Sequence, residues 1–157
     1  VTLFDPALDV EISDRRIDPS RAASLVAGAD LVLDGTDNFE TRFALADACV
    51  RANRPLVYGA ITGFSAQIFL QPAGGAPCLR CLFEAPPADA LNCADAGVLP
   101  GGTMAVGGLM AQAAMGVVLG SWELPWGSLQ VGDLRGMTWR HVRLDARSDC
   151  TCAKRPT

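Results

Sequence analysis

Apolar and polar positions along the chain follow two periods, which together predict alternating strands and helices. Compact apolar runs and every-second-residue patterns predict strands at 8–13, 30–34, 55–61 and 65–72, and a two-stranded hairpin within 127–145. Helical periods follow the first two strands, over 18–29 and from 39 onward. This order predicts an α/β fold with a mostly parallel sheet, helices on both faces, and antiparallel strands in the C-terminal part.

One further segment, 104–119, is apolar almost throughout, and Gln112 is its only strongly polar residue. The run is shorter than the ~20 residues that a membrane-spanning helix needs. We therefore expect a buried helix and no membrane partner. Its glycines and alanines would allow another backbone to pack closely against it.

Composition and charge narrow the classes of protein. The chain has 157 residues, half of them hydrophobic, which suits a single domain over 1–157. Its formal charge is −4 and its basic residues are scattered arginines with one lysine, Lys154, so we expect no nucleic-acid partner. The start of the chain is acidic, whereas a signal peptide has a basic end followed by an apolar run, so we expect no export signal here. We expect a cytoplasmic location, where six cysteines favour metal binding or catalysis over disulfides.

The tetrad Gly35-Thr36-Asp37-Asn38 lies between a predicted strand and a predicted helix. Ligands of parallel α/β sheets bind beyond the carboxyl ends of the strands, so Asp37 could hold Mg²⁺ there. The simpler alternative is that these side chains only cap the helix, with Asn38 as the N-cap. The chain contains no glycine-rich phosphate loop of the dinucleotide or P-loop type. Either nucleotide binding is not the function, or the chain begins after such a loop.

Five segments, in order, resemble the later part of the ThiF/MoeB/HesA family, which comprises adenylyltransferases that activate ubiquitin-like sulfur carrier proteins. The resemblance runs from about Asp30 to the C-terminus. Its segments are DLVLDGTDNFETR, PLVYGAITGFSAQIFL, PCLRCLF, LNCADAGVLPG and the apolar helix. It implies a Rossmann-like fold, incomplete in this chain, and homodimers in the full-length family.

The resemblance also implies a reaction and a site. Family members use ATP and Mg²⁺ to adenylate the C-terminal glycine carboxylate of a carrier, in molybdopterin-synthase or thiamine biosynthesis. By its match to the D-x-T-D-N motif, Asp37 resembles the catalytic, magnesium-binding aspartate. Asn38 and Arg42 match neighbouring positions and are further cofactor-binding candidates. The alternative for Arg42 is a solvated surface arginine.

The family's amino-terminal half, with its ATP loop, has no counterpart here, so the sequence looks like a truncated member or a fragment. We expect this chain alone to show little or no ATP-dependent pyrophosphate exchange. The alternative function is a non-catalytic, zinc-stabilised module that binds the carrier protein and has lost ATP binding.

Cys93 lies in a stretch that resembles the family's crossover loop, where several members carry a cysteine that accepts the activated carrier or its sulfur. Such a cysteine needs thiolate character. Asp89 and Asp95 would raise its pKa, and the single histidine, His141, is remote in sequence. Cys93 therefore remains a catalytic candidate with an unreactive loop thiol as its alternative.

The Cys-x-x-Cys pair Cys78 and Cys81 is open to metal, redox or packing interpretations. Later members of the family close a structural zinc site by pairing such a motif with a second one near the C-terminus. Here that second pair, Cys150 and Cys152, is Cys-x-Cys, one residue short of the usual pattern. The resemblance favours zinc, and a redox pair or free thiols remain the alternatives. Cys49 falls in the apolar pattern of a helix and is expected in the core.

Overall fold

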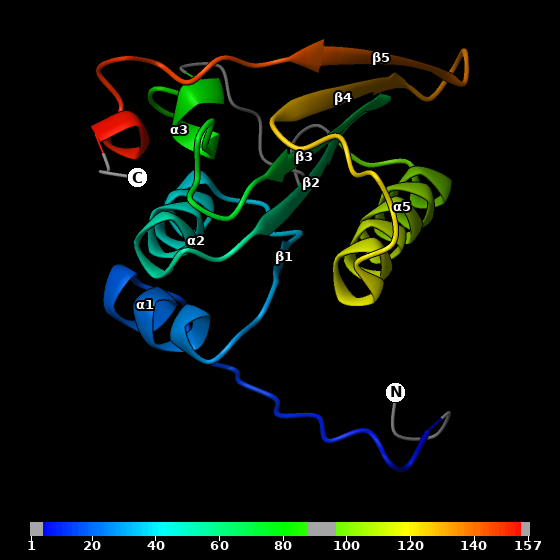
Figure 1. The fold of residues 1–157 in the computed structure, drawn as a ribbon. Helices are drawn as coiled ribbons and strands as arrows, with labels where there is room; N and C mark the ends of the chain where they lie inside the picture. Colours follow the sequence, from blue (N-terminus) through cyan, green and yellow to red (C-terminus); the bar gives the residue numbers. More distant parts are fainter. Residues whose placement is uncertain (1–4, 88–96, 155–157) are drawn as a thin grey trace.

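A five-stranded mixed sheet forms the centre of the molecule in the computed structural model, which describes residues 5–87 and 97–154 (Figure 1). The strands are β1 Val32–Asp34, β2 Leu56–Thr62, β3 Ser65–Gln71, β4 Ser128–Asp133 and β5 Thr138–Arg143. The helices are α1 Pro19–Ala27, α2 Phe39–Ala52, α3 Leu79–Leu82, α5 Pro100–Leu119 and the short 3₁₀ turn η1 Thr151–Lys154. The strands lie side by side in chain order, with β1 parallel to β2 and every later pair antiparallel.

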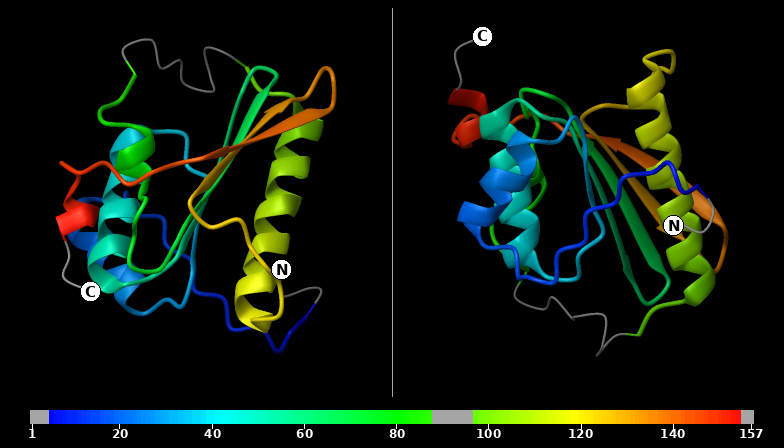
Figure 2. Two further views of the ribbon diagram at one scale, coloured as in Figure 1. Left: turned by 45° about the horizontal axis from the view of Figure 1, so that its top comes forward. Right: turned by 90° about the horizontal axis from the view of Figure 1, so that it is seen from below.

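Helices cover both faces of this sheet, which confirms the predicted α/β class (Figure 2). Side chains alternate between the faces along each strand. Tyr58 belongs to the core with Phe43 of α2, whereas its neighbour Val57 belongs to the core with Met110 of α5. β2 and β3 are buried along most of their length, so successive side chains support one apolar layer on each face of the sheet.

The parallel part of the sheet is smaller than predicted, because the segment 8–13 does not form a strand. Its apolar side chains are exposed, with Ile12 at 88%. Alternation alone does not make a strand, since a strand also needs a hydrogen-bonding neighbour, and none lies beside this segment among the described residues. Among the strands of the described chain, the only parallel pair is therefore β1 with β2.

Helix α2 begins where the sequence predicts. Asn38 is its N-cap, and Asn38 Oδ1 accepts a hydrogen bond from the backbone N–H of Thr41 at 2.9 Å. The helix ends at Ala52, and its C-cap Asn53 closes the last turn with a left-handed φ of 57°. Cys49 is fully buried within it, which confirms the expected core position.

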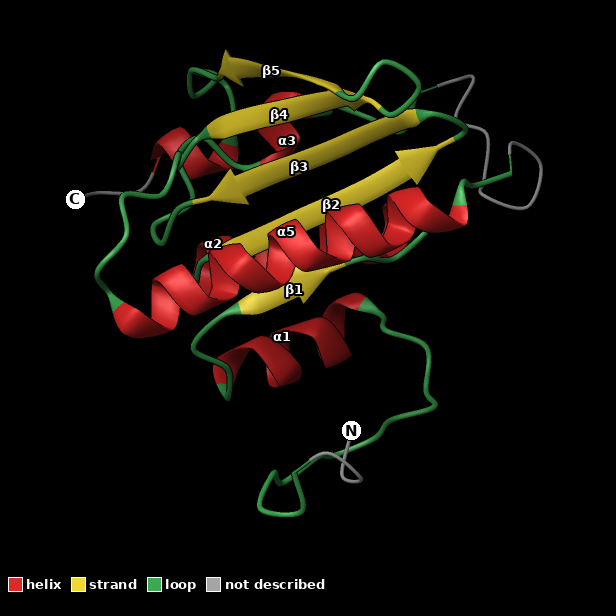
Figure 3. Cartoon of the chain, turned by 90° about the vertical axis from the view of Figure 1, so that its right-hand side faces the viewer, coloured by secondary structure: helices red, strands yellow, loops and turns green. Residues whose placement is uncertain are grey.

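Helix α5 corrects the expectation of a buried helix. It has 20 residues and packs along β2 (Figure 3), where Gly59 permits the close approach because a Cβ there would collide with Met110. Only one stripe of the helix is buried, and outward residues such as Met104 and Val118 are 79% and 76% exposed. By length and composition alone, α5 could also span a membrane, since an 18-residue window within it has a mean hydropathy of 1.5; 28% of that window is buried in the structure.

The predicted C-terminal hairpin is confirmed as β4 and β5. His141 lies on β5 opposite Gln130 and is exposed. After β5 the chain returns across the molecule to η1, which lies beside α3 (Figure 1). The C-terminal segment is thus brought back to the side of the sheet that α2 covers.

Candidate functional site

A carboxylate loop, defined here as residues 34–38, joins the end of β1 to the start of α2. Asp34 is 1% exposed, and its Oδ1 accepts hydrogen bonds from both the backbone N–H and the hydroxyl of Thr36, at 2.9 and 2.8 Å. Asp37 is exposed, and its Oδ1 lies 3.4 Å from the side-chain amide of Asn38. In this loop the carboxylate of Asp34 is therefore buried, and the carboxylate of Asp37 is exposed to solvent.

A cavity of about 250 Å³ lies next to this loop, between β2 and α5. Asp37 and Arg42 both line it, together with apolar and small residues of β2 and α5 such as Gly59 and Val106. The cavity is at the carboxyl ends of the parallel strands, where ligands of such sheets bind. The structure thus places Asp37 and Arg42 in the wall of this cavity, whereas Asn38 is the N-cap of α2 and is not among the lining residues.

Arg42 is only 7% exposed, so the alternative of a solvated surface arginine is wrong. Its Nε and Nη2 both donate to the carbonyl oxygen of Thr36, at 3.1 and 2.7 Å. Its guanidinium carbon lies 5.0 Å from the ring centre of Phe39 and 5.3 Å from that of Tyr58. The side chain is fixed by hydrogen bonds and by cation–π contacts.

Asp34 is a site residue that the sequence analysis missed. Burial raises its pKa, while the hydrogen bonds from Thr36 and the charge of Arg42 act in the opposite direction. Its Oδ2 is buried without a hydrogen-bond partner among the described residues. The available signal was an aspartate that ends an otherwise apolar strand.

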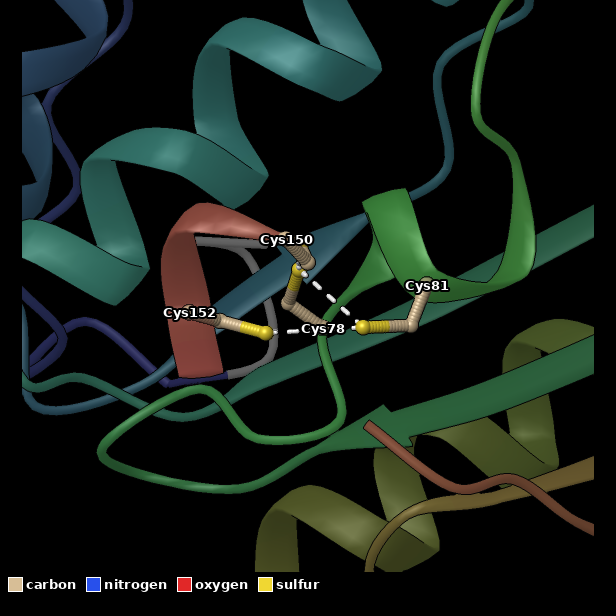
Figure 4. A group of neighbouring side chains, drawn as sticks. All are labelled: Cys78, Cys81, Cys150 and Cys152. Atoms are coloured by element: carbon tan, nitrogen blue, oxygen red, sulfur yellow. Dashed lines mark hydrogen bonds between the residues drawn. The ribbon is translucent and has the colours of Figure 1, made fainter. Parts of the chain in front are cut away.

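The thiol cluster, defined as Cys78, Cys81, Cys150 and Cys152, is the second site (Figure 4). All four sulfur atoms lie within 4.8 Å of one another. The closest pairs are Cys81 with Cys152 at 3.4 Å, Cys78 with Cys150 at 3.5 Å and Cys78 with Cys81 at 4.0 Å. A tetrahedral zinc with Zn–S bonds of ~2.3 Å needs S–S separations of about 3.8 Å, so the cluster fits such an ion. The shorter Cys-x-Cys spacing therefore does not prevent closure of the site.

Two separate segments supply these thiols. Cys78 is the N-cap of α3 and Cys81 lies within α3, whereas Cys150 and Cys152 belong to the turn at η1. Gln71 at the end of β3 holds the first segment: its Oε1 accepts from the N–H of Leu79 at 2.9 Å. Its Nε2 donates to the carbonyl of Ala46 in α2 at 3.3 Å. The sequence analysis missed Gln71, although a polar residue at the end of a buried strand was a visible signal.

The electrostatics of the cluster differ from those of isolated thiols. Burial, followed by the neighbouring sulfurs, raises the pKa of Cys78, and the same causes raise the pKa of Cys152 to about 12. Burial also opposes ionisation of Cys150, but the N–H of Cys152 and the nearby thiols outweigh it and lower the pKa of Cys150. No cysteine in the described residues is in a disulfide. A bound divalent cation would stabilise all four thiolates, so the cluster could hold a metal ion.

The two sites are separate. The carboxylate loop adjoins the first turn of α2, whereas Val50 in its last turns packs against the thiol cluster. A helix of 14 residues is about 21 Å long, so neither site contributes ligands to the other. Cys93 lies outside the described residues, and its proposed role stays a prediction.

The fold and the two sites define a Rossmann-like α/β domain with a carboxylate at the carboxyl end of a parallel strand and a four-cysteine cluster that could hold a metal ion. The profile of the ThiF family matches residues 1–153, and the chain belongs to this family. The resemblance identified from the sequence is therefore confirmed.

Curated relatives carry the same region within longer proteins. The chain is 35% identical over 157 residues to "Adenylyltransferase and sulfurtransferase MOCS3" of Drosophila sechellia, covering 98% of the chain and 35% of that protein. It is 42% identical over 143 residues to MOCS3 of Sus scrofa, covering 88% and 31%. It is 41% identical over 150 residues to "SAMP-activating enzyme E1" of Haloferax volcanii, covering 94% and 55%. The chain thus spans about a third to a half of these relatives.

Solved structures share the fold. Escherichia coli MccB in complex with AMPCPP and MccA superposes with a TM-score of 0.73 at 14% identity, covering 92% of this chain and 45% of MccB. MccB with MccA-N7isoASN gives 0.71 at 15%, covering 95% and 45%. At this level of identity the likeness establishes the arrangement of strands and helices and nothing about the ligand.

Proposed function

We propose that this chain is part of an ATP-dependent adenylyltransferase that activates the C-terminal glycine carboxylate of a ubiquitin-like sulfur carrier protein. The observation that carries the proposal is the placement of Asp37, exposed at the mouth of a cavity beyond the carboxyl ends of β1 and β2, within a ThiF-family chain. The names of the relatives, adenylyltransferase and SAMP-activating enzyme, support this reaction class. A pathway of the molybdopterin-synthase or thiamine-biosynthesis type belongs to the same proposal.

In this proposal Asp37 supplies a hard oxygen ligand to the Mg²⁺ that accompanies ATP, and the magnesium neutralises charge on the phosphates. Asn38 contributes through position, because its Oδ1 is already used by the cap of α2 and its amide nitrogen faces Asp37. The small, apolar lining of the cavity would exclude water from a carboxylate that enters it.

We further propose that zinc occupies the thiol cluster in a structural role. The donor set is four buried or half-buried sulfurs at near-tetrahedral separations, with no position left open for a substrate. The N–H of Arg147 donates to the sulfur of Cys81 at 3.4 Å, a contact of the kind that orients zinc-bound thiolates. Zinc would therefore attach the C-terminal segment to α3.

ATP–pyrophosphate exchange by the intact protein that contains this chain, with and without a carrier ending in glycine, tests the proposed reaction. We expect carrier-dependent exchange in the wild type and a loss of about a hundredfold or more in Asp37→Asn, because magnesium stabilises the developing charge by several kcal/mol. Asp145→Asn is the matched control, since Asp145 is an exposed aspartate outside both sites. Exchange that survives in Asp37→Asn contradicts the assigned role of this residue.

The same intact protein also distinguishes the adenylyltransferase from the alternative function, a zinc-stabilised binding module. A zinc-stabilised binding module would bind the carrier, measured by calorimetry, with no exchange and no ATP binding. That outcome would replace the adenylyltransferase proposal with the module, whereas carrier-dependent exchange would exclude the module.

A further inference from the structure

The side chain of Arg42 is directed at the protein's own backbone. Two of its nitrogens bind one main-chain carbonyl, that of Thr36, and its guanidinium lies close to the rings of Phe39 and Tyr58. Other arginines of the described chain bind carboxylates, as Arg80 does with Asp47 and Arg16 with Glu40. Because the buried Arg42 side chain donates both hydrogen bonds to the Thr36 carbonyl, it stabilises one conformation of the backbone at Thr36.

The conformation concerned is that of the residue before Asp37. The carbonyl of Thr36 and the nitrogen of Asp37 belong to the same planar peptide unit. Arg42 therefore fixes the plane from which the Asp37 side chain departs. From the other side, Asp34 binds the N–H and the hydroxyl of Thr36, so Thr36 is held at both its backbone ends.

We propose that Arg42 is a positioning residue: by fixing the Thr36–Asp37 peptide it directs the Asp37 carboxylate toward a divalent cation at the mouth of the cavity. Its catalytic consequence rests on the proposed adenylyltransferase function. Groups that orient a metal ligand contribute about 10- to 100-fold to metal affinity or activity. Arginine suits the position because its planar fork donates two hydrogen bonds to one acceptor region while stacking on rings, and lysine cannot do both.

Arg80 provides a matched control within the same chain. Its guanidinium also makes paired hydrogen bonds, to Asp47 at 2.8 to 3.1 Å, and lies 4.3 Å from the ring centre of Phe43. It is not in contact with the carboxylate loop. Replacing either arginine by lysine thus removes a comparable set of contacts, and only one replacement affects the peptide before Asp37.

The first measurement is the Mg²⁺ concentration that gives half-maximal pyrophosphate exchange in the intact protein. We expect Arg42→Lys to raise it by about 10- to 100-fold, with the KM for the carrier nearly unchanged. Arg80→Lys should leave the magnesium requirement at the wild-type value. An unchanged requirement in Arg42→Lys, or an equal rise in Arg80→Lys, overturns the inference.

The second measurement does not depend on activity. Backbone ¹⁵N relaxation should show ordered amides at 35–38 in the wild type and in Arg80→Lys, and increased motion at these amides in Arg42→Lys. A loop that stays as ordered in Arg42→Lys overturns the positioning role even if exchange is observed. If the wild type shows no exchange at all, the proposed function fails, and the relaxation data alone then decide whether Arg42 fixes this loop.

Discussion

The carboxylate loop and the thiol cluster are built in opposite ways. The loop and the arginine that holds it lie within residues 34–42, and their hydrogen bonds connect groups one to six residues apart. The cluster joins Cys78 to Cys150, which are 72 residues apart. The loop is held by hydrogen bonds between its own groups, whereas the cluster crowds four sulfur atoms together, and burial raises the pKa of Cys78 and Cys152 there.

This difference indicates how each site depends on a metal. The loop keeps its geometry through protein hydrogen bonds, so a magnesium ion would bind a conformation that already exists. The cluster closes a long stretch of chain, so a bound zinc would contribute to the stability of the folded state itself. Metal removal should therefore affect folding at one site and only ligand binding at the other.

Removing a thiol is the strongest test of this contrast. We expect the wild type to contain one zinc per chain, and Cys150→Ser to lose it together with about 4 kcal/mol of stability, the linkage value for free zinc at ~1,000 times its Kd. Elemental analysis and chelator-dependent melting measure both quantities. Cys49→Ala is the control, because Cys49 is a buried cysteine outside the cluster that should destabilise without releasing zinc. A zinc-free wild type whose melting ignores chelators would remove the distinction between the sites.

The buried amide that supports the cluster should have the next largest effect. Gln71→Met keeps the side-chain volume but removes the hydrogen bonds to Leu79 and Ala46, leaving a buried N–H without its acceptor. We expect a loss of about 2 kcal/mol in urea unfolding and weaker zinc retention against a competing chelator. Unchanged zinc retention would mean that α3 is positioned without Gln71.

At the carboxylate loop, the cap of α2 offers a smaller effect. Asn38→Ala removes the acceptor for the N–H of Thr41, and such caps contribute about 1 kcal/mol. Asn38→Asp keeps the acceptor and should stay near the wild-type stability. Neither variant should change zinc content, and a change would contradict the separation of the two sites along α2.

The smallest effect is a pH dependence that belongs to Asp34. Burial raises the pKa of this carboxyl in the folded state above its unfolded value of about 3.9. The folded state then keeps the proton longer, so the contribution is fully present below the unfolded pKa and is lost as pH rises through the folded pKa. The free energy of unfolding of the wild type relative to Asp34→Asn should therefore fall with rising pH across that window. Urea titrations of both proteins at several pH values measure it, and an opposite slope would contradict a raised pKa.

The sequence by itself determined the features that depend on near neighbours. The periods of burial and the cap at Asn38 involve residues within one or two turns, so the pattern predicted α2, the strands from β1 to β3 and the C-terminal hairpin. It also placed Asp37 at the end of a strand. The matched family motifs added Arg42 and the pairing of the two cysteine motifs.

Only the tertiary structure decided what depends on distant contacts. The segment 8–13 alternates like a strand but has no neighbouring strand among the described residues, and α5 is apolar on every side while only one stripe meets the sheet. Whether Cys150 and Cys152 could close the metal centre depended on the path of the chain after β5. The direction in which the Arg42 side chain points depended on its burial beside Tyr58, which lies on β2. Local sequence encodes hydrogen bonds and periodicity, but burial and long-range closure arise only when separate segments pack together.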